Sequence, residues 1–400
     1  MSEPLSTRAQ WRNVALLCLC QGLFVCSQSS LFLTGGLVGF ALADDKALAT
    51  LPVTTTILGT ALATVPASFY MRRFGRKAGF MTGSCLAMIG ALISAYAISQ
   101  SDFWLFAFGT FLFGCYNAFC QYYRFAAADA SAPAFKAKAL SLVLAGGVIA
   151  GFLGPTLATG TRDLITPYSY LATVLILGGL AAGALVLVSG TRLPGLSEEE
   201  RATSGRPLGQ IMAQPAFIIA ATSSMIGFGV MSLIMTATPL AMISCGFQDT
   251  DAGTVIQWHV LGMFGPSFFT GHLITKFGLS RVMGAGVVAL AVALGFTLSG
   301  IDMANFWAGL VLVGIGWNFL FIGGSTLLTS AYTPSERAKT QAAHDLLVFG
   351  TTASASALSG LLLNHYGWET VNVIAGPFIV AVAVVIGAMA WNQRHARKPA

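Results

Sequence analysis

Residues 168–189 read YSYLATVLILGGLAAGALVLVS, an apolar run that contains no charged side chain. A helix of roughly 20 apolar residues is long enough to cross the hydrocarbon core of a bilayer. Runs of similar length fall near residues 13–34, 48–70, 78–99, 103–124, 138–160, 214–237, 252–274, 282–300, 306–330, 340–363 and 369–391. Helices satisfy their own backbone hydrogen bonds in lipid. The sequence therefore predicts an all-α membrane protein with twelve transmembrane helices.

Composition supports lipid as the main solvent of this chain. Of its 400 residues, 55% are hydrophobic and only 9% are charged, whereas a soluble domain carries roughly 25% charged residues. The net charge of +6 would suggest nucleic acid as a partner of a soluble protein. In a membrane protein, basic residues that set the orientation of the spans explain this positive charge better. We therefore expect the lipid bilayer, and no nucleic acid, as the partner.

The basic residues segregate to one side of the predicted spans. If both termini are cytoplasmic, 19 of the 21 Lys and Arg residues lie on the cytoplasmic side, and only Lys46 and Arg162 lie outside. This asymmetry is the positive-inside pattern of multi-pass membrane proteins. It predicts cytoplasmic termini and an even number of spans.

The two halves of the chain resemble each other at a shift of about 200 residues. Arg73-Phe74-Gly75 corresponds to Lys276-Phe277-Gly278, and Tyr116-Asn117 corresponds to Trp317-Asn318. Together these matches indicate a duplicated six-helix unit. The predicted division is an N-terminal six-helix bundle over 1–190, a cytoplasmic linker over 191–212 and a C-terminal six-helix bundle over 213–400.

Residues 68–77, SFYMRRFGRK, resemble the signature loop of the major facilitator superfamily, and 271–278, GHLITKFG, resemble its second-half echo. The resemblance implies a secondary transporter in which two six-helix halves alternate access to a central site for a small organic solute. The gating residues that it implies are Arg73, Gly75, Arg76 and Lys77. Three positions depart from the family pattern, with Ser68 in place of glycine and Arg72 and Thr275 in place of aspartate.

A narrower resemblance concerns 257–269, QWHVLGMFGPSFF, and 71–80, MRRFGRKAGF. Both are similar to a proteobacterial branch that includes riboflavin-uptake permeases, which implies riboflavin as the substrate and the bacterial inner membrane as the location. The alternative is a proton-coupled efflux antiporter of drugs or metabolites. Gly147, Gly151 and Gly154-Pro155 partly resemble the antiporter motif of the superfamily and keep this alternative open, although Ala150 stands where one glycine would be expected. A kink and a close helix contact are the simpler role for these residues.

Polar residues deep in apolar runs are costly and are candidates for the substrate site. Asn117, Gln121 and Arg124 are spaced to share one helix face, although Arg124 could instead snorkel to the interface. Tyr116 and Trp317 could stack on a ligand or pack between helices. The remaining substrate-binding candidates are Gln21, Gln28, Gln257, His259 and Asn318. For His259 a hydrogen-bonded structural role is favoured.

His344 and Asp345 are the candidates for coupling transport to protons. Asp345 could equally pair with Arg337 or Lys339 at the gate, and we favour the gate role slightly. The chain lacks a His-Glu-x-x-His motif, and its seven cysteines show no ligand spacing. We therefore expect no enzyme activity, no metal and no cofactor, and we expect a monomer.

Overall fold

The computed structural model describes residues 7–45, 48, 51–193 and 205–395. Within these ranges the regular structure is helical and contains no strand. Eleven helical segments of this part are long and apolar enough to cross a membrane. Both chain ends and much of the predicted linker lie outside the described residues.

The first six apolar runs form helices at the expected places. They are α1 (Thr7–Leu42), α2 (Leu51–Phe74), α3 (Arg76–Gln100), α4 (Phe103–Cys120) with α5 (Tyr123–Asp129), η2 (Pro133–Phe135) with α6 (Lys136–Ala145) and α7 (Gly147–Gly160), and α8 (Leu171–Ser189). The fourth and fifth runs are each divided into shorter helices, which sequence periodicity did not predict.

The second six runs follow the short helix α10 (Leu208–Met212). They form α11 (Pro215–Ser244), α12 (Asp249–Phe264) with α13 (Ser267–Phe277), α14 (Leu279–Ser299), α15 (Met303–Leu328), and α16 (Arg337–His395), which contains two spans joined at Gly367. The prediction of twelve spans is confirmed, but the eighth run breaks at Gly265-Pro266. Proline ends the regular helix there because it lacks a backbone N–H.

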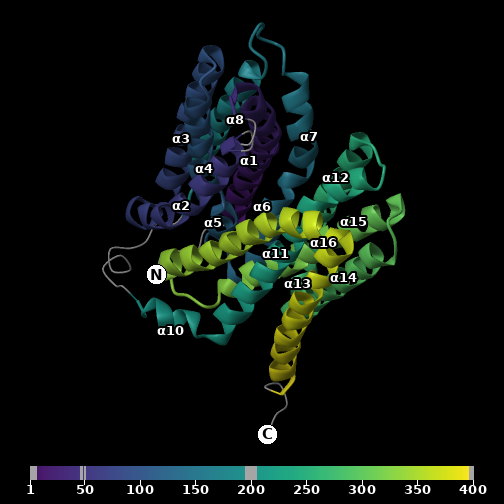
Figure 1. The fold of residues 1–400 in the computed structure, drawn as a ribbon. Coiled ribbons are helices and arrows are strands. Elements are labelled where there is room, and N and C mark those ends of the chain that lie inside the picture. Colours follow the sequence, from purple (N-terminus) through teal and green to yellow (C-terminus); the bar gives the residue numbers. More distant parts are fainter. Residues whose placement is uncertain (1–6, 46–47, 49–50, 194–204, 396–400) are drawn as a thin grey trace. The chain divides into compact units, whose positions relative to one another are not determined.

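Tertiary contacts divide the chain into two compact units. The first contains residues 1–132, 146–204 and 337–342, and the second contains 133–145, 205–336 and 343–400. In the first unit α4 packs against α2 and α3, and in the second α15 packs against α12 and α14 (Figure 1). The grouping of α6 with the second unit follows from its packing on α13 and α15, which chain order alone does not predict.

The backbone confirms the internal repeat at two corresponding turns. Gly75 joins α2 to α3 with φ 90° and ψ 156°, and Gly278 joins α13 to α14 with φ 91° and ψ 153°. This region of backbone space is almost restricted to glycine, because a Cβ atom would be strained there. The two glycines that the sequence pairs therefore make the same turn.

Corresponding helix pairs also approach each other through corresponding glycines. A Cβ added to Gly114 of α4 would lie 2.2 Å from the carbonyl oxygen of Thr56 in α2. In the second unit, a Cβ on Gly314 of α15 would lie 2.7 Å from the carbonyl oxygen of His259 in α12. Small residues that allow such close contact are characteristic of helix packing in lipid.

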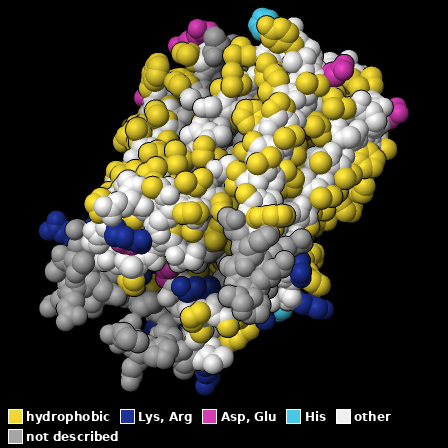
Figure 2. All heavy atoms as spheres, turned by 90° about the horizontal axis from the view of Figure 1, so that it is seen from below, with side chains coloured by type: hydrophobic (Ala, Val, Ile, Leu, Met, Phe, Trp, Pro, Cys, Tyr) yellow, Lys and Arg dark blue, Asp and Glu magenta, His cyan; other side chains and the backbone are white. Residues whose placement is uncertain are grey.

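Large apolar side chains lie on the outside of both units. In the first unit Leu92 and Val186 are 64% and 69% exposed, and in the second Val288 and Val384 are 61% and 66% exposed. Hydrophobic side chains are spread over much of the face drawn in Figure 2, and most of its Lys and Arg side chains lie toward the lower end of that view. Apolar surface on this scale requires lipid around it.

We predict that Gly75→Ala and Gly278→Ala each lower the thermal unfolding temperature of the detergent-purified protein. The reason is backbone strain, which costs roughly 1–3 kcal/mol at such positions. Gly179→Ala in α8 is the matched control, because its added Cβ meets no atom within 4 Å. Equal unfolding temperatures for all three variants would contradict the assignment of strain to these turns.

Candidate functional site

The polar face of the fourth run lies at a break between two helices. Gln121 is the C-cap residue of α4, and Tyr122 is the N-cap residue of α5. Arg124 Nη1 donates to the carbonyl oxygen of Gln121 at 2.8 Å and to its Oε1 at 3.2 Å. The Arg124 guanidinium also lies 4.4 Å from the centre of the Phe125 ring. Arg124 is only 2% exposed, so in this structure it does not snorkel to a surface.

Asn117 lies one turn before Gln121 and is buried. Its side chain makes no hydrogen bond to any part of the chain that the structure describes. Tyr116 beside it is buried and packs edge-to-face on Phe24 of α1, with ring centres 6.0 Å apart. The amide of Asn117 is therefore not engaged within the described chain, and Asn117 stays a candidate for substrate binding together with Gln121.

Asn318, the equivalent residue of the second unit, has its side-chain amide fully hydrogen-bonded. Its Nδ2 donates to the carbonyl oxygen of Met263 and to Ser267 Oγ, both at 2.6 Å, and its Oδ1 accepts from Thr270 Oγ1 at 2.7 Å. These partners flank the break between α12 and α13. Asn318 thus stabilises the broken eighth span, and both of its amide protons are already used.

Trp317 is the centre of an aromatic cluster. Its ring stacks on Phe321 at 5.2 Å and meets Phe228 and Phe264 edge-on at 5.1 and 5.7 Å. Phe349 of α16 lies edge-on to Phe228 at 5.7 Å. Trp317 Nε1 is buried without a hydrogen-bond partner within the described chain. The sequence pointed to Trp317 but not to the partly buried Phe228 and Phe264 beside it, nor to Phe349, which contacts Phe228.

The other substrate candidates do not share one site. Gln21 is buried and Gln28 is half-buried on α1. On α12, Gln257 is exposed, whereas His259 is fully buried with Nδ1 2.7 Å from the carbonyl oxygen of Leu310. His259 therefore contacts α15, and the structure does not bring it together with Gln257.

One predicted gate residue, Arg76, contacts a carboxylate that was not identified from the sequence. Arg76 Nη2 lies 2.6 Å from Asp129 Oδ2 and 2.9 Å from Gln341 Oε1, and Nη1 donates to the carbonyl oxygen of Tyr122. Arg337 Nη1 lies 3.9 Å from the same Asp129 oxygen. A carboxylate on the strongly basic side of the membrane was the sequence signal that could have identified Asp129.

The remaining residues of the loop have separate contacts. Arg73 is exposed and lies over the Phe74 ring at 5.3 Å. Lys77 Nζ donates to the carbonyl oxygen of Ser189 at the end of α8. Ser68, which stands where the superfamily usually has glycine, donates to the carbonyl oxygen of Ala338 at 2.7 Å. The loop therefore joins α2 and α3 to α5, α8 and the first residues of α16, all within the first unit.

Comparison with known proteins decides the family. The model of the Major Facilitator Superfamily matches residues 17–267 and 223–400. This chain belongs to the Major Facilitator Superfamily. It is 41% identical over 375 residues to the riboflavin transporter RfnT of Brucella anthropi, covering 93% of this chain and 94% of the relative. It is 28% identical over 384 residues to the uncharacterized transporter YddS of Bacillus subtilis, covering 91% and 87%.

Solved structures show the same fold. The fucose:proton symporter FucP of E. coli matches with a TM-score of 0.77 at 16% identity, covering 95% of this chain and 98% of FucP. The proton:xylose symporter XylE matches with a TM-score of 0.79 at 12% identity, covering 96% of each chain. The resemblance seen in the signature loop is thereby confirmed, and the chain is a member of a transporter superfamily.

In this superfamily member, the coupling candidates His344 and Asp345 lie near the start of α16. Both side chains are fully buried, and His344 Nδ1 lies 2.8 Å from Asp345 Oδ1. A buried acid next to an imidazole is a suitable arrangement for holding a proton. The proton-coupling role of this pair and the alternative gate role both stay predictions.

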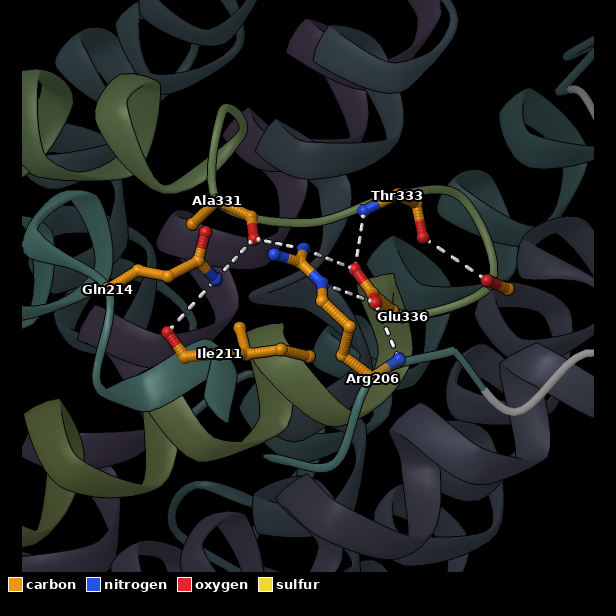
Figure 3. Close-up of polar contacts among 7 residues, drawn as sticks. Arg206, Ile211, Gln214, Ala331, Thr333 and Glu336 are labelled. Atoms are coloured by element: carbon orange, nitrogen blue, oxygen red, sulfur yellow. Dashed lines mark hydrogen bonds and ion pairs between the residues drawn. The ribbon is translucent and has the colours of Figure 1, made fainter. Parts of the chain in front are cut away.

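A second buried carboxylate fixes the end of the linker (Figure 3). Glu336 accepts hydrogen bonds from the backbone N–H of Arg206 at 2.7 Å, from its Nε at 2.8 Å and Nη2 at 2.7 Å, and from the Thr333 N–H at 2.9 Å. Arg206 and Gln214 both donate to the carbonyl oxygen of Ala331. The Arg206 side chain holds the pKa of Glu336 well below its usual range. Residue 206 is thus tied to the loop after α15.

We predict that Asp129→Ala destabilises the protein more strongly than the same substitution of an exposed acidic residue. The side chains of Arg76 and Asp129 are 5% and 10% exposed, and breaking a buried ion pair costs about 3–5 kcal/mol because the remaining charge is left unpaired. Asp163→Ala is the control, since its pair with Arg162 is exposed and worth about 0–1 kcal/mol. Thermal unfolding in detergent measures both variants. Equal losses of stability would show that Asp129 does not support the gate.

Proposed function

We propose that this protein takes up riboflavin across the bacterial inner membrane by alternating access of its two six-helix halves. The observation that carries the proposal is the 41% identity to a riboflavin transporter over nearly the whole length of both chains. A sequence identity of 41% along nearly the whole of both chains favours a shared substrate. The solved structures are only 12–16% identical and support the fold alone.

The side chains of the candidate site support a flat heteroaromatic substrate. Trp317 and the partly buried Phe228 and Phe264 offer ring faces and edges, which suit stacking with an aromatic ring system. Asn117 and Gln121 offer amide groups, which suit the polar edges of such a ring. Each of these two groups of side chains, taken by itself, supports recognition of such a ring system.

The distribution of charge supports the remaining parts of the proposal. Nineteen of 21 basic residues lie on the side that we assign to the cytoplasm, which favours cytoplasmic termini. Intramembrane charges are few, which suits a largely neutral solute better than a multiply charged one. We further propose that the protein works as a monomer and that the buried pair of His344 and Asp345 couples uptake to protons.

The direct test is uptake of radiolabelled riboflavin by proteoliposomes that contain the purified protein. We expect saturable uptake that excess unlabelled riboflavin abolishes, and faster uptake when the outside is made more acidic than the lumen. Empty liposomes are the control. Absence of uptake by correctly inserted protein would refute riboflavin as the substrate. Transport of drugs driven in the opposite direction would favour the efflux alternative.

The second test addresses the binding face. We expect Asn117→Ala and Gln121→Ala to raise the apparent KM for riboflavin by about two- to tenfold, because a hydrogen bond contributes roughly 0.5–1.5 kcal/mol. Gln100→Ala, an exposed residue at the end of α3, is the control and should leave KM unchanged. Asn318→Ala should instead lower the unfolding temperature, since its amide stabilises the α12–α13 break. Unchanged KM in both face variants would place the binding site elsewhere.

A further inference from the structure

A groove of about 440 Å³ opens between α14 and the last part of α16, and we call it the α14–α16 groove. Its lining includes Phe277, Gly278, Arg281, Gly284, Ile386 and Gly387. The two helices are tied at their other ends, where Trp368 Nε1 donates to the carbonyl oxygen of Thr297 at 3.1 Å. Figure 1 shows the last part of α16 leading from this region to the C-terminus. The groove therefore lies at the first turns of α14, away from this hydrogen bond.

The mouth of the α14–α16 groove is positively charged. Arg281 is exposed at the mouth, with Nη1 3.3 Å from the carbonyl oxygen of Phe277. Lys276 is exposed nearby, 5.3 Å above the Phe277 ring. The start of α14 is also here, and Gly278 provides no side-chain cap for its N–H groups, so the positive end of the helix dipole adds to the field. Neither 267–299 nor 370–391 contains Asp or Glu.

The interior of the groove is apolar. Beyond Arg281 its walls are formed by Gly284 and Val287 of α14 and by Ala383 and Ile386 of α16. A cationic mouth above an apolar channel matches an amphiphile with an anionic head and a hydrocarbon tail. If a second copy of the chain packed its own 267–299 or 370–391 segment against the groove, no Asp or Glu would be present to pair with the positive mouth. An anionic amphiphile therefore fits the groove better than a second copy does.

We propose that the α14–α16 groove binds an anionic phospholipid of the phosphatidylglycerol type, with the phosphate at Arg281 and Lys276 and an acyl chain between α14 and α16. Both helices are long and apolar enough to cross a membrane, and Ala383 and Gly387 in the wall of the groove are exposed. The placement of its mouth in the cytoplasmic leaflet rests on the orientation proposed above. The charge and shape of the groove do not depend on that orientation or on riboflavin.

The groove can be filled without disturbing the packed interior. A Cβ atom added to Gly284 or to Gly387 meets no other atom within 4 Å, so Gly284→Leu and Gly387→Leu extend into the space of the acyl chain from opposite walls. Gly295→Leu is the matched control on α14, because its Cβ is equally unobstructed and it does not line the groove. Arg162→Ala is the matched control for Arg281→Ala, because both arginines are exposed.

The experiment is native mass spectrometry of the full-length protein in detergent, titrated with phosphatidylglycerol or phosphatidylcholine. We expect the unmodified protein to prefer phosphatidylglycerol. Gly284→Leu and Gly387→Leu should weaken that binding by about tenfold or more, equivalent to ~1.4 kcal/mol. Arg281→Ala should remove the preference for the anionic lipid while phosphatidylcholine still binds.

Three outcomes would overturn the proposal. One is equal binding of the two lipids by the unmodified protein. Another is phosphatidylglycerol binding by both groove leucine variants at the strength of Gly295→Leu. The third is a dimer that disappears in the groove variants without any change in lipid binding, which would identify a second copy as the occupant. Size-exclusion chromatography confirms that each variant is folded, and Arg281→Ala tests the mouth independently if a leucine variant fails to fold.

Discussion

The bilayer's inability to hydrogen-bond the backbone is the constraint on which this structure depends. Every peptide group within the hydrocarbon core must find its partner inside the protein, and this requirement converts each apolar run into a helix. It also explains where irregular backbone is tolerated. The break at Gly265-Pro266 lies beside Asn318, whose amide donates to the carbonyl oxygen of Met263. A side-chain amide thus donates to a backbone carbonyl oxygen close to the point where the helix is interrupted.

This constraint made much of the fold predictable from sequence. The apolar runs gave the spans because length and composition alone decide whether a helix can cross lipid. The pairing of Gly75 with Gly278 gave the repeat, since a backbone with φ near 90° requires glycine in both halves. The breaks within spans were not predicted, because local periodicity cannot show which tertiary partner will satisfy the freed backbone groups.

The candidate site was only partly predictable for a related reason. Sequence spacing placed Gln121 and Arg124 on one face, and the structure joins them by a hydrogen bond. Spacing could not distinguish Asn117, whose amide makes no bond within the described chain, from Asn318, whose amide is fully engaged. It also missed Asp129 and Glu336, because their partners Arg76 and Arg206 are separated from them by 53 and 130 positions. Such long-range ion pairs are a property of the fold.

The two halves share an architecture but use equivalent positions differently. Each half retains the turn glycine and the close glycine contact of its helix pair, so the duplicated scaffold is under the same packing constraint. The side-chain amide of Asn117 in the first half makes no hydrogen bond within the described chain. The amide of the equivalent Asn318 in the second half is hydrogen-bonded at the break between α12 and α13. The second half gathers its aromatic rings around Trp317 instead. The duplicated scaffold therefore fixes the helix packing in both halves but leaves the chemistry at the equivalent positions free to differ, with an amide in the first half and an aromatic cluster in the second.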